Sequence, residues 1–521
     1  MTRNLWGWGE ESSAVSADQV RSRVESFLGP VEPREPEPPR VPSPRVEVPG
    51  ELAGFSRAEP LERAAHAMGK SYVDRVRGFR GDFASAPDLV SRPRSEEDIL
   101  RLLEVAERER LAVVPYGGGT SVVGGVEPAP RPDQRGALSL DLGHLDALLE
   151  LDDVSRLARL GAGILGPALE RRLGERGFTL RHFPQSFEFS SLGGWIATRA
   201  GGHFATVLTR IDDLLTAVRM ITPRGTFETR CVPASGAGPE PKAWVLGSEG
   251  TLGVVTEAWV RIRPRPIHRA AASVRFGDFW RGVDAVRAIV QAGLAPANCR
   301  LLDSEEALVN GVARDGSSVL LLGFESADVP QAPSLDAALA LARSLGGTAE
   351  HGAAPSGEVA DAWRSSFLRG PYLQDALIRL GILADTFETA CTWKAFPGLH
   401  AAAVGAVGAA LERVCGGGLV TCRLTHVYPD GPAPYFTFLG RARRGAELEQ
   451  WAELKQEASE AVVRSGGTIT HHHAVGRVHR RWFEREQAPA FAAALAAVKR
   501  TLDPAGVLNP GVLLDGAAGA G

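Results

Sequence analysis

The stretch that decides the fold is a glycine-rich segment, and it reads Pro115-Tyr116-Gly117-Gly118-Gly119-Thr120-Ser121-Val122-Val123-Gly124-Gly125. Consecutive glycines leave backbone N–H groups unobstructed, so several can converge on one anion, and a pyrophosphate is the natural occupant. No Gly-Lys-Ser/Thr sequence ends the segment, which excludes the phosphate loop of nucleoside triphosphatases. Pro128, Pro130 and Pro132 prevent a regular helix after it, which excludes a Rossmann loop. A flexible glycine turn without a ligand is the alternative.

Two further segments rich in small residues strengthen the case for a bound cofactor. Residues 183–202 contain Ser190 and Ser191, whose hydroxyls can cap a helical turn beginning at Gly193, and a helix N-terminus with bare glycines is also an anion site. Residues 247–256 place Gly250 and its small neighbours directly before a predicted strand. A flat ring could approach the backbone closely at such a position.

The hydrophobic pattern around these segments predicts two folding units. A capping-box sequence at residues 95–98 begins a helix, a proline in the first turn begins another at 166–167, and strands are predicted at 111–114, 137–142, 156–160, 214–221, 244–246 and 253–262. Residues 90–266 are therefore expected to form one mixed α/β unit. Residues 267–446 are expected to form an antiparallel sheet with helices on one face. Strand patterns occur there at 270–276, 319–324, 422–428 and 435–439, and helical patterns occur at 280–292 and 335–345.

The two ends of the chain complete the predicted organisation. Residues 1–89 are expected to form an N-terminal arm in which Trp6 and Trp8 anchor the packing and eight prolines between positions 30 and 49 make an extended spacer before a helical segment. Residues 447–521 are expected to form a mostly helical C-terminal segment around His471–His473.

Composition excludes several classes of protein. The net charge of −4 over 521 residues argues against nucleic-acid binding through a general basic field. The five cysteines form no CxxC motif, so a disulfide framework or zinc ribbon is not expected, and a reducing compartment is the simplest interpretation. No secretory signal is visible and no run of 18 apolar residues occurs, so we expect a cytoplasmic protein without a membrane-spanning helix.

In order and spacing, the three small-residue segments resemble the FAD-binding domains of the vanillyl-alcohol-oxidase / p-cresol-methylhydroxylase class. The resemblance implies an α+β protein with a two-subdomain FAD-binding domain and an α+β cap domain built on an antiparallel sheet with helices. The pyrophosphate of FAD is then expected on residues 116–121, and the absence of His and Cys from the glycine-rich loop implies non-covalent binding. The cofactor-binding residues implied are Pro115, Tyr116, Gly117, Gly118, Gly119, Thr120, Ser121, Gln185, Ser186, Ser190, Ser191, Gly194, Thr198, Arg199, Gly201, Glu249, Gly250, Thr251, Gly253, Val254 and Val255.

Further stretches resemble one branch of that class, the alkyldihydroxyacetonephosphate synthases, over nearly the whole chain. They are residues 6–9, 71–78, 187–195, 295–303, 387–393, 421–423 and 471–477. The resemblance implies exchange of the acyl group of acyl-dihydroxyacetone phosphate for a long-chain alcohol, through an adduct at flavin N5 and with no net redox change. It also implies lipid-like substrates, a homodimer and peripheral membrane contact.

Tyr435 and His471–His473 match the catalytic tyrosine and the triple-histidine motif of that branch. Strand alternation places Tyr435 and Thr437 on one face, although a core tyrosine with a bonded hydroxyl is the alternative. Proton relay and substrate orientation are the roles implied for the histidines, because imidazole titrates near neutral pH. On a strand, at most two of the three could face one site. We predict no metal ion, since suitable acidic or thiol ligands are absent at nearby spacing.

Arg300 and Arg423 match cationic positions of the branch and suit a substrate phosphate, with a structural ion pair as the alternative. Gln374 stands where the branch usually has arginine, and a neutral amide supplies no charge-assisted bond to phosphate. This difference leaves open an FAD-dependent oxidoreductase acting on a 2-hydroxy acid or another alcohol. A third hypothesis is a flavin-binding protein without turnover.

Overall fold

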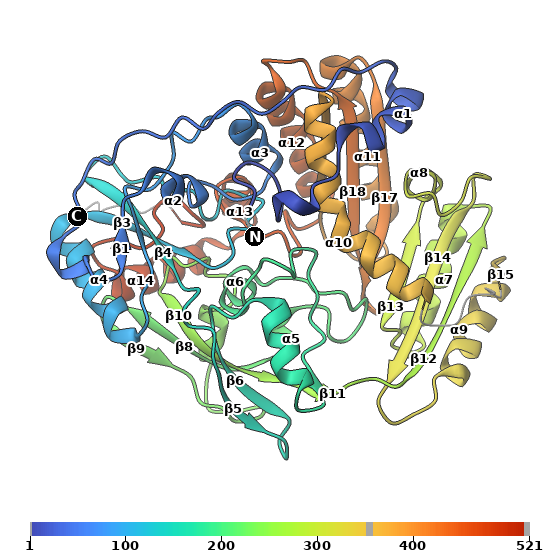
Figure 1. The fold of residues 1–521 in the computed structure, drawn as a ribbon. Helices are drawn as coiled ribbons and strands as arrows, with labels where there is room; N and C mark the ends of the chain where they lie inside the picture. Colours follow the sequence, from blue (N-terminus) through green and yellow to red (C-terminus); the bar gives the residue numbers. More distant parts are fainter. Residues whose placement is uncertain (1–2, 351–357, 515–521) are drawn as a thin grey trace.

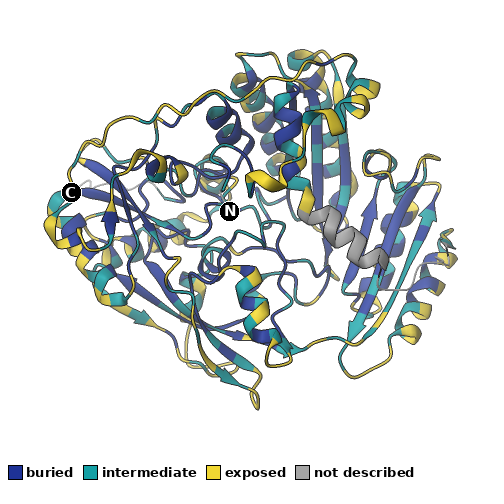
Figure 2. Ribbon diagram, in the orientation of Figure 1, coloured by how far each residue is buried: buried dark blue, intermediate teal, exposed yellow. Residues whose placement is uncertain are grey.

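The computed structural model describes residues 3–350 and 358–514, which form two lobes joined by the two ends of the chain. Strands β1–β11 belong to the first lobe, on the left of Figure 1, and strands β12–β18 form the second, on the right. Buried residues concentrate in the sheets and between the lobes, whereas exposed residues occupy the outer faces of the helices (Figure 2).

The first lobe begins with a four-stranded sheet in the order β1 (Ser56–Arg57), β2 (Leu89–Ser91), β4 (Gly136–Asp141) and β3 (Leu111–Tyr116). Strands β2, β4 and β3 are parallel, and helix α4 (Glu96–Glu109) buries its apolar face against them. The hydroxyl of Ser95 caps α4 by accepting the N–H of Asp98, as expected. The carboxylate of Asp98 accepts the N–H of Arg94 instead of that of Ser95, so a complete capping box does not form.

A five-stranded antiparallel sheet follows, in the order β5 (Leu148–Asp152), β6 (Leu157–Gly161), β10 (Val254–Arg261), β8 (Leu215–Thr222) and β9 (Gly225–Glu228). Helices α5 (Gly166–Gly174) and α6 (Leu192–Thr198) cover its inner face, and β7 (Phe178–Thr179) pairs with β11 (Arg263–Pro264) beside it. The strand predicted at residues 244–246 is wrong. A 3₁₀ turn at Pro241–Trp244 forms there, because Val245 and Leu246 donate their N–H groups to the carbonyl of Lys242.

The second lobe is a seven-stranded antiparallel sheet, which confirms the predicted α+β fold. The strand order is β15 (Thr348–Glu350), β12 (His268–Phe276), β14 (Ser318–Ser326), β13 (Asn298–Leu302), β17 (Gly418–Val427), β18 (Pro432–Arg441) and β16 (Ile382–Glu388). The helices of this part of the chain are α7 (Phe279–Gln291), α8 (Ser304–Val309), α9 (Ala332–Ser344), α10 (Glu358–Arg379), α11 (Phe396–Cys415) and α12 (Glu447–Arg464). One apolar core joins the sheet to α7, α9, α11 and α12.

The N-terminal arm packs as predicted. Trp6 lies edge-on to Phe79 in α3 (Tyr72–Phe79), and Trp8 lies edge-on to Phe189. The backbone N–H of Trp8 donates to the carboxylate of Asp375 in α10. The arm also contains α1 (Ala17–Leu28), and α2 (Pro60–Ala65) follows the proline-rich stretch, in which no helix or strand forms. The arm therefore touches both lobes.

The C-terminal residues are divided between the lobes. Helix α12 packs on α11 of the second lobe, whereas α14 (Pro489–Leu502) inserts Leu495 into the core of the five-stranded sheet. Beyond α13 (Arg480–Glu486) and α14, the N–H of Asn509 donates to the carbonyl of Val113 in β3. The loop of residues 465–479, which carries the three histidines, is thereby held between the lobes. No helix within residues 3–350 and 358–514 is long and apolar enough to cross a membrane.

Candidate active site

The three small-residue segments meet in the first lobe. The N–H groups of Gly247 and Glu249 donate to carbonyls of Ile196 and Ala197 at 3.1 and 2.9 Å, so the third segment is bonded to the second. A Cβ added at Gly118 would overlap the carbonyl of Phe189, so the first segment lies directly against the second. Segments far apart in sequence therefore form one continuous backbone surface, as the sequence predicts.

The glycine-rich loop presents unused hydrogen-bond donors. The backbone N–H groups of residues 117–121 donate to no other residue that the structure describes. Gly119 has φ +65°, and a Cβ there would overlap the phenol of Tyr116, whose hydroxyl donates to the carbonyl of Ala65. A row of unpaired N–H groups on a tight glycine turn is the arrangement that an anionic pyrophosphate requires.

Side chains of the second segment stabilise its own turn. The hydroxyl of Ser191 accepts the N–H of Gly194 at 3.3 Å and caps α6, while the hydroxyl of Ser190 accepts the indole N–H of Trp195 at 2.6 Å. The hydroxyl of Thr198 donates to the carbonyl of Gly194. The predicted capping is therefore confirmed for Ser191, whereas Ser190 holds the indole of Trp195.

The remaining residues that we assigned to the cofactor contribute mainly to the framework. Arg199 forms an ion pair with Asp212, and the hydroxyl of Thr251 donates to the carbonyl of Ser248. The carboxylate of Glu249 accepts the N–H groups of Val475 and Gly476, which ties the third segment to the histidine loop. The carbonyl of Ser186 accepts backbone N–H groups of its own turn, and Val254 and Val255 pair with β8. The remaining positions each contact one neighbouring residue: Gln185 lies beside Gly370, Gly201 lies beside His472, Gly250 lies against Pro115, and Gly253 lies against Met220.

The chemistry of this surface fits FAD. Besides the free N–H groups of residues 117–121, the hydroxyl of Ser248 and both ring nitrogens of His182 are buried without a hydrogen-bond partner among the described residues. Buried polar groups in native proteins almost always have a partner, so these atoms call for an additional polar group at this place. A dinucleotide offers phosphate oxygens and ring heteroatoms for them.

The histidine loop is fixed to the second lobe by one carboxylate. Glu388, the last residue of β16 and 3% exposed, accepts the N–H groups of His471, His472 and His473 at 2.7, 3.1 and 3.0 Å. It also accepts the hydroxyl of Thr470 at 2.6 Å. The three histidines lie in an irregular loop and not on a strand, so the limit of two that we inferred for a strand does not apply to them. Successive rings meet edge to face, with centroids 5.3 Å apart for His471 and His472 and 4.8 Å apart for His472 and His473.

Burial and charge set the protonation states of this cluster. Burial alone raises the pKa of Glu388, but the positive charge that the three imidazoles carry when protonated and the hydrogen bond from Thr470 more than compensate, so its pKa lies well below the usual range and it is ionised. Burial lowers the pKa of His471 to about 3 and lowers those of His472 and His473 as well. The resting imidazoles are therefore neutral and able to accept a proton.

Tyr435 lies beside the histidine loop. In the pairing of β16 with β18 it is directly opposite Glu388, and its ring centroid is 6.1 Å from His472 and 5.5 Å from His473. Its hydroxyl donates to Thr386 at 3.0 Å. Burial raises the pKa of Tyr435, although the guanidinium of Arg423, 4.1 Å from the ring centroid, opposes that shift. The phenol is therefore protonated at neutral pH.

The two arginines lie near each other, but Gln374 has a separate partner. Arg423 forms a buried ion pair with Glu306, which agrees with the structural alternative. Arg300 is fully buried. Burial and the charge of Arg423 lower the pKa of Arg300 to about 9. The guanidinium of Arg300 donates to the carbonyl of His203 at 3.4 Å. The amide of Gln374 donates to the carbonyl of Ala384 at 2.6 Å.

Three residues of this site were missed by sequence reasoning: Glu388, His426 and Tyr428. His426, His471 and His472 place one donor atom each within 4.8 Å of one another, close enough to hold a metal ion, and the prediction of no metal had considered only residues 471–473. In this structure His426 Nδ1 bonds the carbonyl of Phe204, and His471 bonds both Tyr428 and His472. The signal for Glu388 was an acid at the end of a largely apolar strand, which also contains Asp385.

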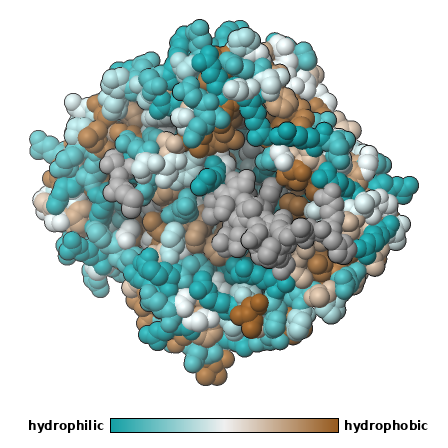
Figure 3. Space-filling view, turned by 45° about the vertical axis from the view of Figure 1, so that its right-hand side comes forward, coloured by the Kyte–Doolittle hydropathy of each residue, from teal (hydrophilic) through white to brown (hydrophobic). Residues whose placement is uncertain are grey.

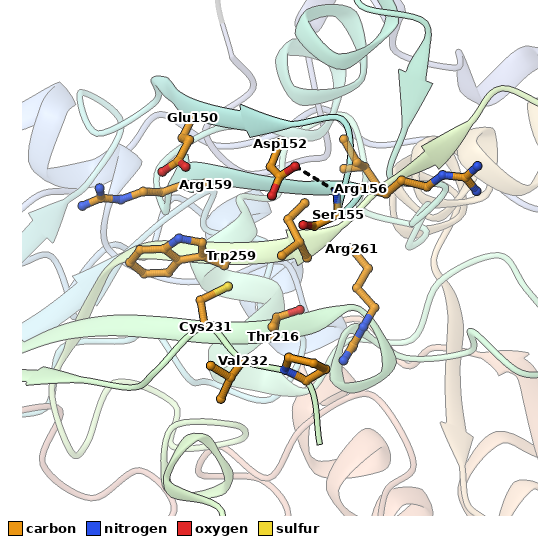
Figure 4. Close-up of a pocket in the computed structure, with 13 residues that line it drawn as sticks. Glu150, Asp152, Ser155, Arg156, Arg159, Thr216, Cys231, Val232, Trp259 and Arg261 are labelled. Carbon is orange, nitrogen blue, oxygen red and sulfur yellow. Dashed lines mark hydrogen bonds between the residues drawn. The ribbon is translucent and has the colours of Figure 1, made fainter. Parts of the chain in front are cut away.

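A separate surface cavity of about 520 Å³ lies on the outer face of the five-stranded sheet. Charged side chains of β5, β6 and β10 surround Trp259, Cys231 and Thr216 there (Figure 4). Trp259 alternates with Ala258 and Val260, which belong to the core under α5 and α6, so the cavity opens on the side of the sheet away from the glycine-rich loop. It has no part in the site described above.

Replacing Gly118 with alanine is expected to abolish FAD binding, because the added Cβ would overlap the carbonyl of Phe189 and displace the loop. We expect a loss of affinity of at least about a hundredfold, or about 2.8 kcal/mol. The measurement is flavin absorbance per mole of purified protein. Gly398→Ala is the matched control, since a Cβ there meets no atom within 4 Å. A Gly118→Ala protein that purifies with wild-type flavin content would remove the loop from the cofactor site.

Comparisons with known proteins agree with this geometry. The family model of the FAD binding domain matches residues 87–230, and that of the C-terminal domain of FAD linked oxidases matches residues 265–513. An alkyldihydroxyacetonephosphate synthase of Caenorhabditis elegans is 32% identical over 87% of this chain and 80% of its own length, and that of Trypanosoma brucei brucei is 29% identical over 88% and 78%. A solved alkyldihydroxyacetonephosphate synthase superposes with a TM-score of 0.82, covering 98% of both chains at 24% identity.

The predicted cofactor and fold are thus confirmed: the protein is an FAD-dependent enzyme built from an FAD-binding domain and a cap domain. The chain belongs to the alkyldihydroxyacetonephosphate synthase family.

Proposed function

We propose that the protein exchanges the acyl group of acyl-dihydroxyacetone phosphate, or of a related ester, for a long-chain alcohol, forming an ether lipid precursor. The observation that carries the proposal is the cluster in which Tyr435 lies against His472, His473 and Arg423 beside the FAD-binding segments. When bound, FAD supplies an electron-rich ring nitrogen that can act as a nucleophile. We also propose that it is held non-covalently, since the glycine-rich loop contains neither His nor Cys.

The side chains around that cluster suit the proton and charge requirements of such an exchange. Tyr435 is protonated and can donate to a substrate oxygen, while the neutral imidazoles of His472 and His473 can accept the proton of the incoming alcohol. Glu388 keeps the imidazoles in place and favours the charged form of His472, whose Nδ1 is 3.5 Å from its carboxylate.

Arg300 and Arg423 support the assignment of a phosphate-bearing substrate. Both guanidiniums are buried, the charge of Arg423 lowers the pKa of Arg300, and Glu306 forms an ion pair with Arg423. A substrate phosphate beside this pair would add the negative charge that two close guanidiniums favour. Gln374 would contribute at most neutral hydrogen bonds, and its amide is already bonded to Ala384.

Homodimerisation, peripheral membrane contact and a cytoplasmic location are parts of the same proposal. All five cysteines are free, which supports a reducing compartment. Lipid substrates of this kind reside in bilayers, which supports contact with a membrane surface. The face drawn in Figure 3 is mostly hydrophilic with several separate apolar patches.

Incubation of the FAD-loaded protein with palmitoyl-dihydroxyacetone phosphate and hexadecanol is expected to yield the ether product and palmitate without oxygen uptake. The products can be followed by mass spectrometry and oxygen by an electrode. Reduction of an artificial electron acceptor with a 2-hydroxy acid, in the absence of ether product, would establish the oxidoreductase alternative instead. Binding of FAD with neither activity would establish the alternative without turnover.

A further inference from the structure

A chain of hydrogen bonds leads from the histidine loop toward the surface through Tyr428. His472 Nδ1 lies 3.1 Å from His471 Nδ1, and His471 Nε2 lies 2.7 Å from the hydroxyl of Tyr428. That hydroxyl lies 2.9 Å from the hydroxyl of Thr209. His471 is 7% exposed, whereas Tyr428 is half-buried and is followed by the exposed residues Pro429 and Asp430. The chain therefore begins beside Tyr435 and reaches Tyr428, a half-buried residue at the start of an exposed turn.

The proposed reaction needs such an outlet. The alcohol loses its proton as its oxygen bonds to the substrate carbon, the ester C–O bond breaks, and the fatty acid leaves as a carboxylate. One proton is thus released to water in each turnover at neutral pH, since a carboxyl group has a pKa of about 4.3. The imidazoles that would receive the proton are buried, and a proton left there would block the next cycle.

We propose that Tyr428 is the outlet of a proton relay that runs from His472 through His471 to solvent. A proton taken up by His472 leaves through its Nδ1 to Nδ1 of His471. The Nε2 proton of His471 then passes to the oxygen of Tyr428, whose own hydroxyl proton leaves to water. This inference rests on the proposed function for its chemistry, but its hydrogen bonds stand independently of the substrate.

The surroundings of Tyr428 suit transfer rather than storage of a proton. Burial keeps the pKa of His471 near 3, so the ring passes a proton on instead of retaining it. Burial raises the pKa of Tyr428, so its hydroxyl carries a proton to donate. The phenol of Tyr428 is also exposed to nearby charges of both signs, which belong to Arg210, Asp212 and Asp213.

The position of Tyr428 is well fixed. The indole N–H of Trp393 donates to its carbonyl at 3.0 Å, and the N–H of Tyr428 donates to the carbonyl of Gly431 at 2.9 Å. His426, near the end of strand β17 and two residues before Tyr428, is bonded through Nδ1 to the carbonyl of Phe204 and is not a member of the hydrogen-bonded chain. Removing only the hydroxyl of Tyr428 therefore interrupts the relay without changing the bonds that hold its backbone.

Tyr428→Phe is expected to lower kcat for ether formation by about tenfold or more, with KM changed less than about twofold. The solvent deuterium isotope effect on kcat should increase, because proton release becomes rate-limiting. Tyr428→His, which can again accept and donate a proton, should recover a substantial part of kcat. Tyr72→Phe is the matched control, since Tyr72 of α3 is buried in the apolar core outside the site. The activity of this variant should equal that of the wild type.

Unchanged kcat in Tyr428→Phe would overturn the relay. So would a loss of kcat with an unchanged isotope effect and no recovery in Tyr428→His, because that pattern indicates a purely structural role. A second readout needs no turnover: in protein labelled with ¹⁵N-histidine, Tyr428→Phe should shift the Nε2 resonance of His471, and an unshifted resonance would refute the bond. If the wild type forms no ether, the proposed function fails while this resonance still decides whether the chain exists.

Discussion

Replacing Tyr435 with phenylalanine is expected to abolish ether formation while FAD stays bound. The hydroxyl is the only group lost, and it belongs to a protonated phenol whose ring centroid lies 6.1 Å from that of His472 and 5.5 Å from that of His473. General acid catalysis by a positioned side chain typically contributes about 10²–10⁴-fold, so turnover should fall by at least that factor. The measurement is ether product formed per mole of bound flavin.

Stability and cofactor content are the controls for Tyr435→Phe. Phenylalanine preserves the ring contacts with the imidazoles and with Arg423, and it loses only the bond to Thr386. We therefore expect a melting temperature and flavin content close to those of the wild type. Near wild-type turnover in the variant would remove Tyr435 from the mechanism and leave it as a core tyrosine.

Replacing Glu388 with glutamine is expected to reduce turnover about a hundredfold or more and to destabilise the protein by about 3–5 kcal/mol. The carboxylate accepts four hydrogen bonds from residues 470–473, and an amide must turn an NH₂ group toward some of these donors. The loop that carries all three imidazoles would then lose its fixed geometry. Chemical denaturation and ether-forming assays give the two values.

The pH dependence provides a second test of Glu388. Its folded-state pKa lies below the value for an unfolded chain, so its contribution to stability is complete above the unfolded pKa of about 4.3. That contribution is lost as pH falls through the lower folded-state value. The stability difference between wild type and Glu388→Gln should therefore be largest at neutral pH and shrink in acid.

Glu35→Gln is the matched control for Glu388→Gln, because the side chain of Glu35 is 81% exposed and its ion pair with Arg379 should contribute little. We expect its stability and turnover to match the wild type. A Glu388→Gln protein with full activity, or with a stability difference that does not change with pH, would contradict the role assigned to this carboxylate.

The sequence predicted the backbone of the site better than its side-chain partners. Residues 117–121 were identifiable because a run of glycines has few uses other than close approach of the backbone, and the structure places that run against residues 189–191. Strands such as β8 and β10 were identifiable because their apolar residues dominate locally. Trp244 was misassigned because an apolar triplet gives no sign of the turn that Pro241 begins.

Long-range polar contacts were the part that the sequence could not supply. Glu388 precedes His471 by 83 positions, and nothing local to either residue shows that one carboxylate holds three consecutive N–H groups. The same applies to Tyr428 and His471, which the sheet and the C-terminal loop bring within 2.7 Å. The pairing of Arg423 with Glu306 likewise depends on the packing of α8 against β17.

A crystal structure of the FAD-bound protein tests the central claim most directly. The account predicts that the pyrophosphate accepts hydrogen bonds from N–H groups of residues 117–121 and that the N5 edge of the flavin faces Tyr435 and His472. A flavin whose pyrophosphate lies elsewhere, or whose N5 edge is separated from both side chains by protein, would contradict it.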